Sequence, residues 1–310
     1  MSTIKEIRKK AVSYLLASPF LKKNRCYTLK DASLDVDLIF SHILKTTRTH
    51  LIASLDDEIN EKIISKAEYL FKLRYNGLSL AYIMEEKEFY GLSFYVNQDV
   101  LIPKADTELL VEKGILAINE LKGDATGVAL EGREKPLNIL DIFSGSGCVA
   151  ISIAMSFFSS YHYYTLIDIS QKALNVAKRN AKKHLSSLDY ISFCKHDALQ
   201  PFPLKNGKKY DLILANPPYV PTKDVLNLLS DGRSEPRLAL DGGEDGLTFY
   251  HALAKHSFDS LSEKGILLSE IGDGQSEDVI AIFKNAGFSL CVEHKDLSGE
   301  KRVVEARKML

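Results

Sequence analysis

The stretch Leu137-Asn-Ile-Leu-Asp-Ile-Phe-Ser-Gly-Ser-Gly-Cys-Val-Ala-Ile-Ser152 decides the fold. Its apolar start predicts a buried strand, its glycines predict a sharp turn, and the residues from Cys148 onward predict a helix. The turn is not a dinucleotide fingerprint, because Ala150 stands where the third glycine would be, and it lacks the Gly-Lys-Ser/Thr end of a phosphate loop. On its own it resembles any strand-to-helix turn. The acidic Asp141 at the strand end disfavours a pyrophosphate and suits a cationic ligand.

Predicted strands and helices alternate through the rest of this region. Strands are expected near residues 137–142, 163–168, 190–195, 210–215, 264–270, 288–294 and 302–307. Helices are expected near 147–157, 170–185, 246–260 and 274–286. This alternation is typical of an α/β fold built on a doubly wound, mostly parallel sheet.

Polar residues stand at the ends of four successive predicted strands, namely Asp141, Asp168, Asp197 and Asn216. Open α/β sheets bind ligands beyond the carboxyl ends of their strands, so we expect these side chains to share a pocket. Asp168 has the position that binds ribose hydroxyls in nucleotide folds, although before Ser170 it could also be only a helix cap. Asp197 is placed to meet an adenine edge. The set predicts a pocket for a positively charged nucleoside, which S-adenosylmethionine fits.

The segment Asn216-Pro-Pro-Tyr219 directly follows the predicted strand 210–215. Its two prolines have fixed φ angles and no N–H, so neither strand nor helix continues. The Asn216 side-chain oxygen and the Pro217 carbonyl are two acceptors for a planar –NH2 group, and the Tyr219 ring can cover its plane. An isolated Asn-Pro is more often a turn. The four residues in this order after a buried strand predict an amino-group site.

The first 85 residues read as a small helical bundle. Helices are expected at about 3–17, 31–44 with Asp31 as the cap, 47–54 and 58–75. Phe89–Val96 predicts a short hairpin. A helix capped by Asp106 or Thr107 should then run to about residue 121, and a surface loop should occupy 122–135.

Composition excludes several classes of protein. The chain has 310 residues and a net charge of −1, which gives no global attraction to nucleic acid or membrane. Residues 1–30 nevertheless hold eight Lys and Arg against Glu6 alone, which predicts either a solvated helix face or a dock for an acidic or RNA-bearing partner. The four cysteines, Cys26, Cys148, Cys194 and Cys291, are scattered, which fits a reducing cytoplasm and no metal site. No apolar run is long enough to span a bilayer.

Several longer strings of residues resemble those of one known protein family. Phe89-Tyr-Gly-Leu-Ser-Phe94, Val100–Pro103, Asp106–Glu112 and Glu235–Leu247, together with Asn216–Tyr219, resemble the PrmC/HemK family over essentially the whole chain. Members of this family are N5-glutamine methyltransferases that modify the Gln of the Gly-Gly-Gln motif in class 1 peptide chain release factors, and so act in translation termination.

The resemblance implies a class I methyltransferase fold, with S-adenosylmethionine as cofactor and S-adenosylhomocysteine as product. It implies a helical substrate-docking domain at 1–85, a hairpin linker at 86–104 and a methyltransferase domain at 105–310. Asn216, Pro217 and Tyr219 would be catalytic, and Pro218 would join them in binding substrate. The cofactor would be held by Asp141, Phe143, Ser144, Gly145, Ser146, Gly147, Asp168, Asp197, Ala198 and Asn216. A cytoplasmic monomer is expected, with a release factor as partner and no need to bind nucleic acid or membrane.

Three positions depart from the family pattern. Lys104-Ala105 replaces an Arg-Pro, which keeps the charge but loses a proline. Ala198 stands where a large apolar residue usually covers the adenine, so that contact is expected from Leu199 or Phe202. Tyr250 is followed by His251 instead of Arg.

Two other functions fit parts of the sequence. A nucleic-acid amino methyltransferase, acting on adenine N6 or guanine N2, would share Asn216–Tyr219 and could use the basic N-terminal segment to hold RNA or DNA. Such an enzyme should be broadly basic, and this chain is nearly neutral. A non-catalytic cofactor-binding protein would have no need of an intact Asn216–Tyr219 segment.

Overall fold

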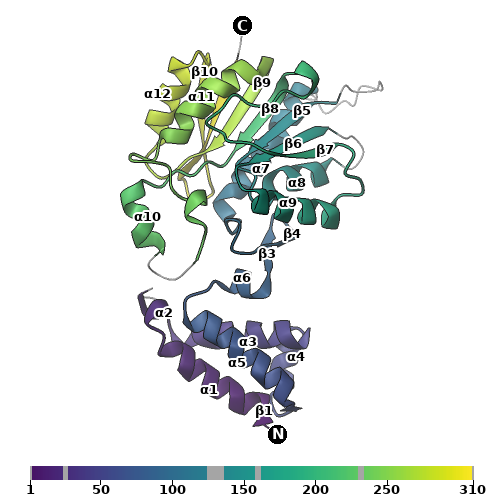
Figure 1. Cartoon of the computed structure of the whole chain (residues 1–310), viewed down its shortest axis with the longest axis vertical. Helices are drawn as coiled ribbons and strands as arrows, with labels where there is room; N and C mark the ends of the chain where they lie inside the picture. The colour runs from purple at the N-terminus through teal and green to yellow at the C-terminus, as the bar shows by residue number, and fades with distance from the viewer. Residues whose placement is uncertain (1, 24–26, 124–135, 158–161, 230–233, 309–310) are drawn as a thin grey trace. The chain divides into compact units, whose positions relative to one another are not determined.

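The computed structural model describes residues 2–23, 27–123, 136–157, 162–229 and 234–308 (Figure 1). The chain forms two compact units. The first contains Met1–Glu86 and Leu226–Glu235, and the second contains Lys87–Val225 and Pro236–Leu310. Cys26 and most of the predicted loop 122–135 lie outside the described residues. Within the described ranges, no helix is long and apolar enough to cross a membrane.

The first unit is the predicted helical bundle. Its helices are α1 (Ile4–Leu16), α2 (Pro19–Lys23), α3 (Leu29–Leu44), α4 (Arg48–Ala53), α5 (Glu61–Tyr75) and α6 (Leu80–Met84), drawn in purple to blue in Figure 1. The two-residue strands β1 (Ser2–Thr3) and β2 (Glu58–Ile59) pair in antiparallel fashion. Apolar residues at helical spacing on α1, such as Ile4, Ile7, Ala11 and Leu15, join one buried core.

The predicted start of α3 was wrong. The helix begins at Leu29, and Thr28 rather than Asp31 is the cap. The Thr28 hydroxyl accepts a hydrogen bond from the Asp31 backbone N–H (3.4 Å), and the Asp31 carboxylate accepts one from the Thr28 backbone N–H (2.8 Å). This is a capping box, in which the acidic residue three positions on returns the bond of the capping residue. The sequence contained the pattern, but Asp31 alone was read as the cap.

The second unit contains a seven-stranded sheet in the order β10-β11-β9-β8-β5-β6-β7. Its strands are β5 (Asn138–Ile142), β6 (Tyr163–Asp168), β7 (Ile191–Lys195), β8 (Tyr210–Ala215), β9 (Leu261–Glu270), β10 (Leu290–Lys295) and β11 (Lys301–Arg307). The five strands from β7 to β9 are parallel, and β11 is antiparallel to both its neighbours. The predicted α/β fold with a mostly parallel sheet is confirmed.

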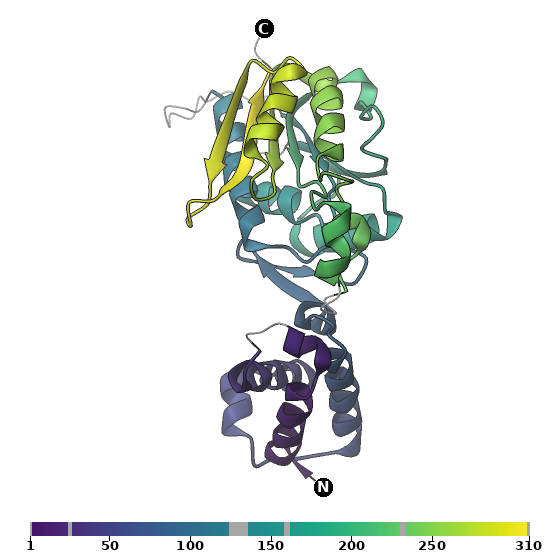
Figure 2. The ribbon, with the colours of Figure 1, turned by 90° about the vertical axis from the view of Figure 1, so that its left-hand side faces the viewer.

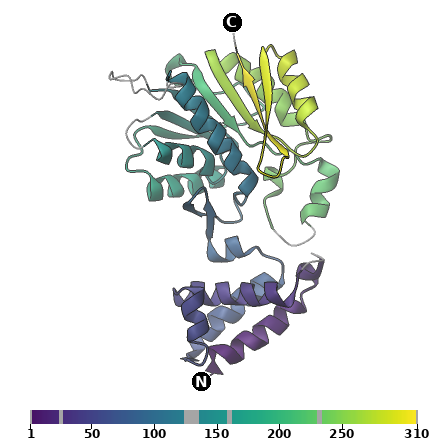
Figure 3. The same ribbon diagram turned by 180° about the vertical axis from the view of Figure 1, so that it is seen from behind.

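Helices cover both faces of this sheet because alternate strand residues point to opposite sides. Ile139 and Leu212 pack in one core, beneath α7 (Glu108–Leu121), α8 (Cys148–Ser156) and α9 (Gln171–His184), and Figure 3 shows α7 crossing this face. Leu140 and Ile213 pack in the other core, beneath α11 (Thr248–Ser260) and α12 (Ser276–Asn285), which lie side by side in Figure 2. Burial on both faces explains the continuous apolar runs of β5 and β8.

Shorter elements complete the chain. The predicted hairpin consists of β3 (Glu86–Phe89) and β4 (Leu92–Tyr95). The segment before α7 contains a short helix, η1 (Ala105–Thr107), and two more of this kind are η2 (Lys205–Gly207) and η3 (Arg237–Ala239). Helix α10 (Thr222–Leu229), like α2 and α6, was not predicted.

Candidate active site

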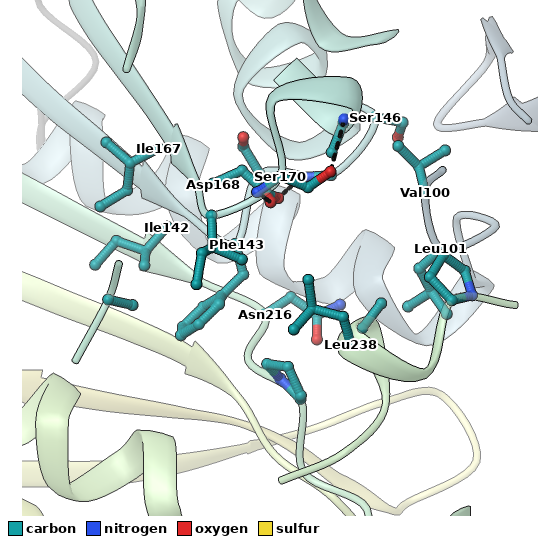
Figure 4. Close-up of a pocket in the computed structure, with 18 of the residues that line it drawn as sticks. Val100, Leu101, Ile142, Phe143, Ser146, Ile167, Asp168, Ser170, Asn216 and Leu238 are labelled. Carbon is teal, nitrogen blue, oxygen red and sulfur yellow. Dashed lines mark hydrogen bonds between the residues drawn. The ribbon is translucent and has the colours of Figure 1, made fainter. Parts of the chain in front are cut away.

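A pocket of about 430 Å³ opens at the carboxyl ends of β5, β6 and β8 (Figure 4). Strand β5 lies between β6 and β8, so the chain order of the sheet reverses here. Ligands of doubly wound sheets bind at this topological switch point, and a volume of this size suits a small-molecule ligand. The residues that line the pocket include Val100, Leu101, Lys104, Thr107, Asp141, Ile142, Phe143, Ser144, Gly145, Ser146, Ile167, Asp168, Ile169, His196, Asp197, Ala198, Leu199, Asn216, Pro218, Leu238 and Phe249.

The structure brings most of the sequence-predicted residues to this one pocket. Asp141, Asp168, Asp197 and Asn216 all line it, as the four strand ends predicted. Gly147, Pro217 and Tyr219 are not among its lining residues, although each lies next in sequence to one that is. Of the two apolar residues considered for the adenine contact, Leu199 lines the pocket, whereas Phe202 is buried in the core below the sheet.

The turn after β5 has a backbone that only glycine suits at one position. Gly147 has a φ angle of 78°, and a Cβ there would lie 2.9 Å from Ile151 Cδ1 and 3.1 Å from Ala177 Cβ. Its neighbour Gly145 donates its N–H to the Asp168 carboxylate (3.0 Å). Phe143 also has a left-handed φ of 60°, which is unusual for an aromatic residue, and its ring packs edge-on against Phe249.

Asp141 is buried and Asp168 is half-buried, and the two carboxyls differ in their partners. Asp141 is 3% exposed and accepts one backbone hydrogen bond, from Ala150 (3.3 Å). Burial raises its pKa to about 7. Asp168 accepts from Gly145 and from Ser170 (2.8 Å), and burial raises its pKa while these two bonds oppose the shift. Two such carboxyls facing one pocket favour a ligand with positive charge or with hydroxyl donors.

Orphaned polar atoms give an independent test of the ligand. Among the described residues, Ser144 Oγ and His196 Nε2 are buried and have no hydrogen-bond partner. Buried polar atoms are normally paired, so these two lining side chains fit a ligand that carries polar groups. Ile142, Ile167 and Leu199 supply apolar walls for a flat ring. These lining residues therefore fit S-adenosylmethionine. The carboxyls suit its positive charge and its hydroxyl groups, and the apolar walls suit its base.

Three side-chain hydrogen bonds hold the Asn216–Tyr219 segment in place. Asn216 Nδ2 donates to Thr107 Oγ1 (3.1 Å), and the Tyr219 hydroxyl donates to Glu270 Oε1 (3.3 Å). Gln275 Nε2 donates to the Tyr219 carbonyl (3.1 Å). Sequence reasoning missed Glu270 and Gln275 and considered Thr107 only as a helix cap. The one available signal was that Glu270 ends the strand beside β8.

The 240–246 segment packs against the same loop. Backbone hydrogen bonds join Val220 N–H to the Leu240 carbonyl (2.9 Å) and Gly242 N–H to the Val220 carbonyl (2.8 Å). A Cβ at Gly246, where φ is 79°, would lie 2.4 Å from the Tyr219 carbonyl oxygen. Close backbone approach therefore requires a glycine at position 246 of the Glu235–Leu247 string, which resemblance alone did not explain.

Comparisons with known proteins agree with this geometry. Residues 133–242 match the model of a methyltransferase domain, and residues 16–84 match that of the PrmC N-terminal domain. The chain is 36% identical over 293 residues to a release factor glutamine methyltransferase of Bacillus anthracis, covering 94% of this chain and 96% of that one. It is 32% identical over 280 residues to that of Geobacter sulfurreducens, covering 90% of each.

A solved structure shares the fold alone. The hMettl16 catalytic domain in complex with an RNA hairpin has a TM-score of 0.53 and 15% sequence identity, over 86% of this chain and 90% of that one. Methyltransferases of this fold use S-adenosylmethionine, which the pocket fits. This identity over 90% or more of the chain, together with the two matching domain models, establishes that the chain belongs to the release factor glutamine methyltransferase family.

Proposed function

We propose that the protein methylates the side-chain amide nitrogen (N5) of the glutamine in the Gly-Gly-Gln motif of class 1 release factors. The observation that carries the proposal is the setting of Asn216. This residue lines the pocket, and its Nδ2 donates to Thr107 Oγ1. Its Oδ1 is left as an acceptor beside the pocket, and a substrate –NH2 group needs such an acceptor.

The residues of the chain act by positioning. A carboxamide nitrogen is a poor nucleophile because its lone pair is delocalised into the carbonyl. Asn216 Oδ1 and the Pro217 carbonyl each accept one substrate N–H and so aim the nitrogen. Alignment of this kind can lower a barrier by about 7–11 kcal/mol. The same two acceptors stabilise the positive charge that develops on nitrogen.

The transfer is balanced without a strong base. When bound, S-adenosylmethionine supplies the methyl group: a nitrogen–carbon bond forms, the carbon–sulfur bond breaks, and its electron pair stays on sulfur. The methylated nitrogen is strongly acidic until it loses its proton, so water can accept that proton. The hydrogen bond from the Tyr219 hydroxyl to Glu270 restrains the Asn216–Tyr219 segment.

The helical unit is proposed to dock the release factor. Lys9, Lys10 and Lys22 are exposed, whereas Arg8 is paired with the fully buried Asp37 (2.6 Å). The exposed lysines suit an acidic partner surface. A monomeric enzyme that acts in the cytoplasm without direct nucleic-acid binding remains a prediction from the sequence.

The affinity for S-adenosylmethionine is expected to fall as the pH is lowered from about 8 to about 6. Because the pKa of Asp141 is about 7, its carboxyl is ionised above that pH and can attract a cation. Below it, binding the cation requires loss of a proton, so the dissociation constant should rise roughly tenfold per pH unit. Isothermal titration across this range measures the effect. Asp141→Asn, which cannot ionise at this position, should show a shallower dependence, and a slope equal to that of the wild type would argue against the role of Asp141.

The activity is tested with S-adenosylmethionine labelled in its methyl group. A class 1 release factor, its Gln→Ala variant in the Gly-Gly-Gln motif, total RNA and DNA are offered in parallel. We expect label on the intact release factor alone. Label on RNA or DNA instead would favour the nucleic-acid amino methyltransferase and would make the basic N-terminal segment, residues 1–30, its dock.

A further inference from the structure

A buried carboxyl lies close to both Asn216 and Tyr219, the two ends of the segment. Glu270, the last residue of β9, is 2% exposed, and its Oε1 accepts from the Tyr219 hydroxyl (3.3 Å). Its Oε2 is buried and has no partner of hydrogen-bond geometry among the described residues. On the other side, Asn216 Nδ2 donates to Thr107 Oγ1 (3.1 Å). The proposed mechanism needs the Asn216 amide in one orientation, and the residues around it can fix that orientation.

The neighbours of Glu270 indicate how the two sides are joined. Burial raises the pKa of Glu270 to about 7, and hydrogen bonding from Thr107, and then from Tyr219, opposes the shift. Asp106, next to Thr107 in η1, raises it further, and Asn216 lowers it. Hydrogen bonding from Thr107, Tyr219 and Asn216 thus favours the ionised form of the carboxyl, whereas burial and Asp106 favour its protonated form. Of these, Thr107 also contacts the Asn216 amide.

Counting donors and acceptors gives this arrangement a direction. A hydroxyl that accepts a bond from Asn216 Nδ2 must send its own proton elsewhere, and an ionised carboxylate is an acceptor only. We infer that the Glu270 carboxyl is the acceptor toward which the Thr107 hydroxyl turns its proton, which leaves the Thr107 lone pairs to Asn216. If Thr107 instead donated to Asn216, the amide would be turned over. The Asn216 –NH2 group would then face the pocket. It would meet the substrate –NH2 group, and because both groups are donors, no hydrogen bond could form between them.

We propose that Thr107 and Glu270 are positioning residues that fix the Asn216 amide with Oδ1 toward the substrate. The inference rests on the proposed amide-methylating function. Through Tyr219, the same carboxyl holds the other end of the segment, so one buried group sets both the amide orientation and the loop. A wrong amide orientation removes a preorganised acceptor, and the loss of one such contact costs on the order of 10²-fold in rate.

The kinetic test compares Thr107→Val, which removes the hydroxyl at nearly constant shape, with Thr107→Ser, which keeps it. We expect Thr107→Val to lower kcat on the release factor by about 10–10²-fold, with little change in KM or in the dissociation constant of S-adenosylmethionine. Thr107→Ser should recover most of the rate. Glu270→Gln should also lower kcat, because its amide can donate to Thr107 and so permit the reversed orientation. Melting temperatures of all three variants identify any that fail to fold.

A second measurement does not depend on substrate. In uniformly ¹⁵N-labelled protein, the Asn216 side-chain –NH2 signals, assigned by their loss in Asn216→Asp, should exchange slowly with solvent in the wild type and in Thr107→Ser. They should exchange faster in Thr107→Val. Unchanged kcat and unchanged exchange in Thr107→Val, or equal losses in the Val and Ser variants, would overturn the proposed positioning of Asn216 by Thr107 and Glu270. A wild-type enzyme that does not methylate the release factor, but keeps the slow exchange that Thr107→Val abolishes, would overturn the proposed function and leave this positioning role intact.

Discussion

Replacing Asn216 with alanine is expected to lower kcat for release-factor methylation by about 10²–10³-fold. The substitution removes the Oδ1 acceptor that aims the substrate nitrogen. The remaining walls of the pocket, including Asp141 and Asp168, are unchanged. The dissociation constant for S-adenosylmethionine should therefore stay within a few-fold of the wild-type value. Single-turnover rates with a saturating release factor, combined with calorimetric titration of the cofactor, separate the two effects.

Asn175→Ala is the matched control. Asn175 is an exposed asparagine on α9 whose side-chain oxygen accepts a hydrogen bond from Gln171, one turn away on the same helix, and it does not line the pocket. Its substitution should leave both quantities unchanged. An Asn216→Ala enzyme that turns over at the wild-type rate would exclude the acceptor role of this residue.

Gly246→Ala is expected to reduce kcat by about 10²-fold although it adds a single carbon outside the pocket. The new Cβ would lie 2.4 Å from the Tyr219 carbonyl oxygen, so the backbone of the Asn216–Tyr219 segment must move. A shift of about 1 Å in a positioning group can cost this much in rate. The left-handed φ of 79° adds a backbone penalty of about 1–2 kcal/mol. Steady-state kinetics and a thermal melt measure the two consequences.

Gly274→Ala separates clash from backbone strain. Gly274 has nearly the same φ, 77°, but a Cβ there meets nothing within 4 Å. We expect this variant to lose a similar amount of stability to backbone strain and to keep wild-type kcat. An equal loss of rate in both variants would show that packing of the 240–246 segment against Tyr219 does not position the Asn216–Tyr219 segment.

The sheet could be predicted because its signals are local. Strands such as β5 and β8 are buried on both faces, so each is a continuous apolar run that ends in a polar residue. The helices that were missed, α2, α6 and α10, have five, five and eight residues. Pieces this short show little periodicity, so an apolar stripe cannot be recognised in them.

The pocket could be predicted for a related reason, whereas the residues that hold the Asn216–Tyr219 segment could not. Parallel strands bring their carboxyl ends to one edge, so Asp141, Asp168, Asp197 and Asn216 could be grouped without coordinates. The contacts of Thr107, Glu270 and Gln275 with that loop join residues 51–109 positions apart in the chain. A threonine before a helix looks like a cap, and a glutamate after an apolar strand looks like a surface residue. Only the fold turns them toward Asn216 and Tyr219.

The most direct test of the central claim is tandem mass spectrometry of a release factor incubated with the enzyme and S-adenosylmethionine. The proposed function predicts one added methyl group, located on the side-chain amide of the glutamine in the Gly-Gly-Gln motif. It also predicts that the group is nearly absent when Asn216→Ala replaces the wild-type enzyme. A methyl group on any other residue, or an unmodified release factor beside methylated nucleic acid, would contradict the proposal.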